Sequence, residues 1–95
     1  MLEEVKAFLN FTWTDTSREK KIESYINSSK AYLNSVAGKE IDFDADLLAR
    51  DLLFNRVLYM DSQALPDFNQ NYSDMINELR IAYLVKKDEQ TDSVQ

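Results

Sequence analysis

The sequence predicts an all-α protein, a compact bundle of four main helices followed by a C-terminal segment that is either flexible or ordered by a partner. Apolar residues recur three and four positions apart over long stretches, which is the spacing of one helix face. Glycine and proline, which interrupt helices most strongly, occur once each, at Gly38 and Pro66. Because 95 residues suit one core, we expect a single helical domain over residues 1–85 and a polar tail over residues 86–95.

The first predicted helix runs from about Leu2 to Asn10. Glu3 and Glu4 lie in its first turn, where carboxylates favour the positive end of the helix dipole. Its apolar residues share one face: Leu2, Val5, Phe8 and Leu9. An irregular connection of aromatic, β-branched and short polar residues is expected at 11–15.

The second predicted helix covers about residues 17–37 and has the clearest boundaries. The stretch from Thr16 to Glu19 has the form of a capping box with Thr16 as N-cap. Gly38 suits the left-handed residue that ends a helix. Lys30 and Asn34 fall on the face toward solvent. The opposite face is expected to pack on the core: Ile22, Tyr25, Ile26, Ser29, Leu33 and Val36.

The third predicted helix, from about Ala45 to Gln63, is expected to be the central one. Its apolar residues occupy most of the circumference, so other helices should pack around it. Asp44 is interpreted as its N-cap. Arg50 and Arg56 interrupt the apolar surface. Each of them extends toward solvent, pairs with an acid within the fold, or contacts a neighbouring subunit.

Pro66 is expected to follow the end of the third helix, because a proline disfavours helical backbone geometry at the residue before it. A loop rich in Asn and Gln should then lead to a shorter fourth helix that starts at Asn71 or Ser73 and ends near Arg80. The apolar run at 81–85 fits either an extension of that helix or a strand. The polar residues after it are expected to order only on a partner.

Composition argues against most catalytic chemistry. The chain contains no histidine and no cysteine, which removes the commonest proton shuttle, the thiolate nucleophile and the usual zinc ligands. A calcium loop starting at Asp42 would need Gly and Glu where Leu47 and Leu53 stand. We therefore expect no enzyme, no cofactor and no metal. Acid–base catalysis by the carboxylates of Glu40, Asp42 and Asp44 is the alternative.

The chain is acidic, with 17 Asp and Glu against 11 Lys and Arg, a net charge of −6 at pH 7. Such a protein repels DNA on average, although an acidic wall suits a channel through which DNA slides. No run of about 18 apolar residues occurs, so no membrane partner is expected. The absence of cysteine fits the reducing cytoplasm.

Four patterns together indicate a family. They are the Leu-Glu-x-Val-Lys-x-Phe-Leu opening, a Tyr-Leu-Asn-x-x-x-Gly end to the long helix, a Leu-rich helix that follows an Asp-rich loop and closes on Tyr-Met-Asp, and an Ile-x-x-Leu-Arg ending. They lie at residues 2–9, 32–38, 47–61 and 76–80. The layout resembles the head–tail connector (head-completion adaptor) proteins of tailed bacteriophages and prophages over nearly the whole chain.

The resemblance implies a structural, non-enzymatic role. Copies would form a ring under the portal, extend the DNA channel and join the DNA-filled head to the neck or tail. The implied partners are other copies of the chain, the portal protein and the next neck or tail-completion protein, while DNA passes without sequence-specific binding. The implied location is the virion neck, and the host cytoplasm during assembly. The segment from Ile81 onward is expected to dock on the portal.

A ring requires each subunit to present two complementary patches. Large apolar residues in or beside the predicted connections are either lids of the core or anchors of an interface. We select as candidate subunit or portal contacts Phe11, Trp13, Phe43, Leu65, Phe68, Tyr83 and Leu84. The alternative function is a small acidic phage-encoded helical regulatory protein that binds one host partner.

Overall fold

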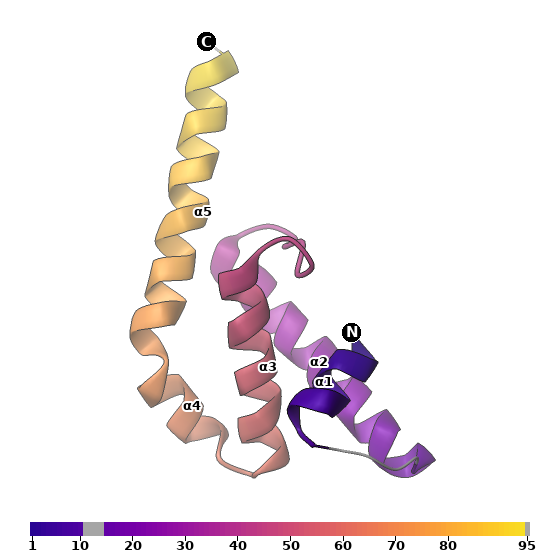
Figure 1. Cartoon of the computed structure of the whole chain (residues 1–95). Coiled ribbons are helices and arrows are strands. Elements are labelled where there is room, and N and C mark those ends of the chain that lie inside the picture. Colours follow the sequence, from indigo (N-terminus) through magenta and orange to yellow (C-terminus); the bar gives the residue numbers. More distant parts are fainter. Residues whose placement is uncertain (11–14, 95) are drawn as a thin grey trace.

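The computed structural model describes residues 1–10 and 15–94, and it places side chains as far as Leu84. The described chain is compact and all-helical, as the sequence predicts, and the described part contains no strand. Figure 1 shows its helices, which number five rather than four: α1 (Leu2–Phe8), α2 (Thr16–Ala37), α3 (Leu47–Asp61), α4 (Leu65–Asn71) and α5 (Ser73–Val94).

Helix α3 is the centre of the fold, as its apolar circumference predicts. It packs against each of the other four helices. Among the large apolar residues of α3, Leu47 at the start of the helix is exposed, with 74% of its surface accessible. The core draws on all five helices and on the α2–α3 loop: Val5, Ile22, Ile26, Leu33, Ile41, Phe43, Ala49, Leu52, Leu53, Val57, Phe68, Ile76, Leu79 and Tyr83.

The start of α2 differs from the predicted capping box by one residue. Asp15 is the N-cap, and its carboxylate accepts a hydrogen bond from the Arg18 backbone N–H at 3.2 Å. Thr16 is therefore the first helical residue, and Glu19 pairs with the Lys6 ammonium of α1 instead of capping α2. With Asp15 as N-cap, Arg18 and not Glu19 occupies the third helical position, so the Glu19 carboxylate is free to pair with the opposite charge of Lys6. Gly38 ends α2 with a left-handed φ of 77°, as predicted.

The start of α3 is also displaced from its prediction. Asp46, not Asp44, is the N-cap, and its carboxylate accepts from the Ala49 N–H at 3.1 Å. The Asp42 carbonyl accepts from the N–H groups of Ala45 and Asp46, which closes a turn before the helix. Asp44 lies in that turn, where its N–H donates to the Asp42 carboxylate at 3.0 Å.

The prediction of a loop between Pro66 and the last helix is wrong, because this stretch forms α4. Pro66 occupies the first turn, where its missing N–H is not needed. Helix α5 then runs from Ser73 to Val94, so residues 81–85 are helical and residues 86–94 continue the same helix. In Figure 1 its C-terminal half extends beyond the other helices, and the molecule measures 53 × 25 × 16 Å.

Candidate functional site

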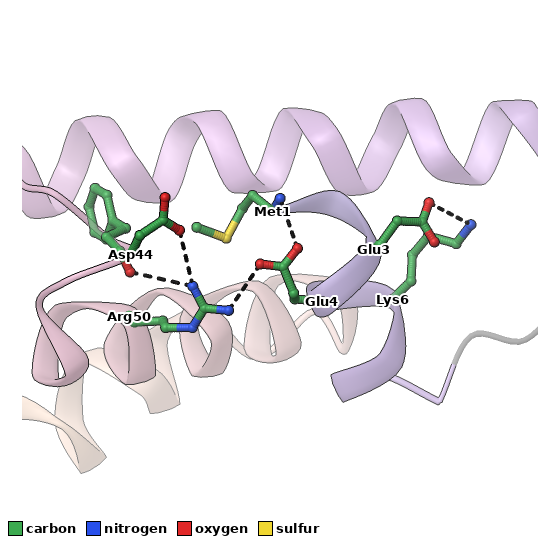
Figure 2. Close-up of polar contacts among 7 residues, drawn as sticks. Met1, Glu3, Glu4, Lys6, Asp44 and Arg50 are labelled. Carbon is green, nitrogen blue, oxygen red and sulfur yellow. Dashed lines mark hydrogen bonds and ion pairs between the residues drawn. The ribbon is translucent and has the colours of Figure 1, made fainter.

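A polar network joins α1 to α3 and to the loop that precedes α3 (Figure 2). The Arg50 guanidinium donates to Glu4 at 3.0 Å, to the Asp44 carboxylate at 3.4 Å and to the Phe43 carbonyl at 3.5 Å. The amino group of Met1 lies 3.0 Å from Glu4. This amino group and then Arg50 hold the pKa of Glu4 below its usual value. Of the alternatives that the sequence left for Arg50, the structure therefore shows pairing within the fold.

A polar cavity of about 330 Å³ lies beside this network, between the start of α1, α2 and the α2–α3 loop. It contains the three carboxylates that the sequence offers for acid–base catalysis, and its lining is Met1, Lys30, Asn34, Glu40, Ile41, Asp42, Phe43 and Asp44. Asp42 accepts from the Asp44 N–H, and Asp44 faces Arg50, so two of these carboxylates hold the loop. In the part of the chain that the structure describes, no three such side chains are arranged to hold a metal ion.

Asn34, near the end of α2, makes a contact with the following loop that the sequence did not predict. It was expected to face solvent, but its Oδ1 accepts from the Ile41 backbone N–H at 2.9 Å. This bond ties the end of α2 to the loop and helps to keep Ile41 and Phe43 in the core. The six residues between Asn34 and Ile41 gave no local signal, because the contact depends on how the loop turns back.

The residues selected as candidate contacts have different positions in the fold. Phe11 and Trp13 lie outside the described residues. Leu84 is 54% exposed, so it presents an open apolar surface. Three of the others belong to the core and the fourth is half-buried against it: Phe43, Phe68 and Tyr83, with Leu65. For the three buried rings, the structure shows lids of the core, which was the first of the two alternatives.

Phe68 holds α4 against α3, and its ring also packs at the junction between α4 and α5. Its ring stacks on Tyr72, with centroids 4.9 Å apart, and meets Tyr59 edge-to-face at 5.8 Å. The Tyr72 hydroxyl donates to the Asn55 side-chain oxygen at 3.1 Å. Burial is the main reason that the pKa of Tyr72 is raised. Phe68 is fully buried in this cluster, so it has no free surface to offer a partner.

Tyr83 ties α5 to the start of α3. Its hydroxyl donates to the Asp46 carboxylate at 2.6 Å, while the other oxygen of the same carboxylate caps α3. Burial and then this hydrogen bond raise the pKa of Tyr83 to about 12. The Lys39 ammonium lies 5.9 Å from the centroid of the Tyr83 ring. The position of α5 beyond the bundle is therefore set by a specific polar contact at its midpoint.

An exposed apolar pair lies on α5 at this midpoint. Ile81 is 51% exposed and Leu84 is 54% exposed. A spacing of three residues puts them on one side of the helix, away from the buried Tyr83. The sequence analysis selected Leu84 but did not select Ile81. The sequence did contain a signal for Ile81, because its position along the helix places it on a different face from the buried residues Ile76, Leu79 and Tyr83.

Arg56 is the second feature that the sequence left open. Its side chain is buried between α2 and α3, where Nη1 donates to the Ser29 hydroxyl at 3.0 Å and the guanidinium lies 4.6 Å from the Tyr32 ring centroid. Its Nε is buried and has no hydrogen-bond partner in the part of the chain that the structure describes. Within residues 1–10 and 15–84 no carboxylate pairs with it. Burial lowers the pKa of this guanidinium.

No protein-family model matches the chain, and no curated protein or solved structure matches it either. The connector interpretation therefore depends on the sequence patterns and on the physical features of the fold. Among the described residues, no helix is both long and apolar enough to cross a membrane. Two features of the described residues stand out, the exposed apolar pair on α5 and the buried cation at Arg56.

Proposed function

We propose that this chain is a structural head–tail connector of a tailed bacteriophage or prophage. Copies form a ring under the portal, extend the DNA channel and join the DNA-filled head to the neck or tail. The observation that carries the proposal is the exposed pair Ile81 and Leu84 at the midpoint of α5, next to the half of this helix that projects from the bundle. An exposed apolar pair on a helix that extends past its own bundle is a surface for a second protein.

The strength of that contact favours a multivalent assembly. Complete burial of a Leu or Ile side chain contributes about 1.5–3 kcal/mol, so covering two side chains that are already half-buried contributes about 2 kcal/mol. Such a contact holds one copy only weakly. In a ring, each copy is also held by its neighbours, and the ring presents many such contacts to the portal at once.

In this proposal, the helices form the body and the docking segment of the subunit, and the net charge suits the wall of the channel. Helices α1 to α4 and the first half of α5 form the bundle, which is the body of the subunit. The segment from Ile81, including the polar tail at 86–95, docks on the portal. The net charge of −6 suits the wall of a channel because a moving polyanion does not bind to it.

The proposal is tested by affinity capture with the tagged full chain from lysates of cells that produce the encoding phage or induced prophage, followed by mass spectrometry. We expect portal and neck proteins to be recovered. The variant Ile81→Glu/Leu84→Glu should lose the portal and keep the stability of the bundle. The matched control is Ser24→Glu/Ser28→Glu, which adds the same charge at exposed positions of α2 and should still capture the portal.

Two results would contradict the proposal. Recovery of a single host protein without virion components would favour the regulatory alternative. Retention of the portal by the α5 variant, at the level of the α2 control, would show that the apolar pair is not the docking surface.

A further inference from the structure

Among the described residues, no anion accompanies the cation of Arg56, which the fold buries. The side chain is 8% exposed, and its polar neighbours are the Ser29 hydroxyl and the Met60 sulfur, at 3.0 and 3.4 Å from Nη1. The Tyr32 ring face offers the guanidinium a further attraction. None of these groups carries a formal negative charge. A buried charge is unfavourable unless an opposite charge and hydrogen bonds compensate for it.

Other cationic side chains of the same fold pair with carboxylates. Lys6 pairs with Glu19, and Arg50 pairs with Glu4 and Asp44. Arg18 forms a two-bond contact with the Asp61 carboxylate, at 3.0 and 2.9 Å. Asp61 lies only five positions from Arg56 on α3, but Arg18 occupies both of its oxygens.

The guanidinium of Arg56 retains donors for a carboxylate. Its Nε has no partner, and Nη2 makes no hydrogen bond within the described residues. Tyr32 and Met60, which flank it, are themselves only half-buried, so the group lies just beneath the surface. A carboxylate that meets Nη2 from outside the molecule forms a charge-assisted hydrogen bond in a partly desolvated setting, where such bonds are strong.

We infer that Arg56 is a binding residue for a carboxylate of a second copy of this chain, which neutralises the guanidinium when copies pack side by side. Charge complementarity selects this occupant. Each copy carries 17 acidic and 11 basic residues, so like-charged copies repel each other unless a cation of one meets an acid of the next. The inference rests on the proposed function, because it assigns a contact between neighbouring subunits of the ring.

The test replaces Arg56 by methionine, which has a similar length and no charge. Removal of an uncompensated buried charge should raise the Tm of the free chain by roughly 4–8 °C. Loss of the cation should raise the concentration of chain required for ring formation on purified portal by about thirtyfold or more, measured by sedimentation and electron microscopy. Lys21→Met removes the same charge from an exposed position of α2 and should change neither quantity.

Each outcome separates this inference from the connector proposal. If the unchanged chain forms no ring on the portal and does not bind it, the proposed function fails and the inference fails with it. If the unchanged chain forms rings and Arg56→Met forms them equally well, only the inference fails. A lower Tm for Arg56→Met would also overturn it, since Arg56 would then stabilise the monomer through Ser29 and Tyr32.

Discussion

Replacement of Phe68 by alanine tests whether α4 is a structural part of the bundle. The Phe68 side chain is fully buried and contacts the rings of Tyr72 and Tyr59. Truncation of a buried phenylalanine to alanine costs about 3–5 kcal/mol through lost transfer free energy and the cavity that remains. The two ring pairs account for about 0.5–1.5 kcal/mol each within this total, so we expect a loss of about 4 kcal/mol.

That loss is a large part of the free energy of unfolding, which is about 5–15 kcal/mol for a domain. Urea denaturation followed by circular dichroism should show the midpoint falling by roughly 2–3 M with an unchanged slope. Phe8→Ala is the matched control, because Phe8 is 40% exposed and meets only the edge of Phe54 among the aromatic contacts described for it. Its cost should be about 1 kcal/mol.

A Phe68→Ala cost as small as that of the control would refute this reasoning. It would mean that the ring faces solvent in the free protein, and the interface alternative from the sequence would then apply. Loss of partner capture with full stability would have the same meaning.

Three further predictions concern the capping groups and the α5 contact. The pKa of Tyr83 is about 12 in the folded chain and about 10 in the unfolded chain, so Tyr83 stabilises the fold below about pH 10 and this stabilisation is lost as pH rises toward 12. The free energy of unfolding, measured at about pH 9 and about pH 11.5, should therefore fall less for Tyr83→Phe than for the unchanged chain. Asp46→Ala should cost about 1–2 kcal/mol and Asp44→Ala at most about 0.5 kcal/mol in urea denaturation; equal costs would contradict Asp46 as N-cap. Gly38→Ala should cost about 1 kcal/mol through its positive φ alone, because no atom lies within 4 Å of the added Cβ, and an unchanged midpoint would contradict that origin.

The helices with strong apolar periodicity could be predicted from the sequence. Helices α2 and α3 lie within one or two residues of their expected ranges, and the central place of α3 followed from its apolar circumference. Helix α4 could not be predicted, because Pro66 and the Asn- and Gln-rich residues after it favour a loop locally. Burial of Phe68 against Tyr59 and Tyr72 outweighs that preference.

The candidate site was predictable only in part. Leu84 was selected as a large apolar residue beside a predicted connection, and it is exposed. Phe43 and Tyr83 were selected by the same reasoning and are buried. A single apolar residue near a connection carries no local sign of the direction in which its side chain points, so sequence could not separate these cases.

By itself, the sequence determined the helical class, the main helix boundaries and the exclusion of histidine and cysteine chemistry, since these depend on composition and on spacing along the chain. The tertiary structure alone decided which acid caps α3, which arginine finds a carboxylate and which apolar residues remain exposed. Arg50 and Arg56 are the clearest case. Both interrupt the same apolar helix, but one faces Glu4 across the bundle and the other is enclosed between α2 and α3. Pairing across space depends on the packing angles of helices, which no local pattern specifies.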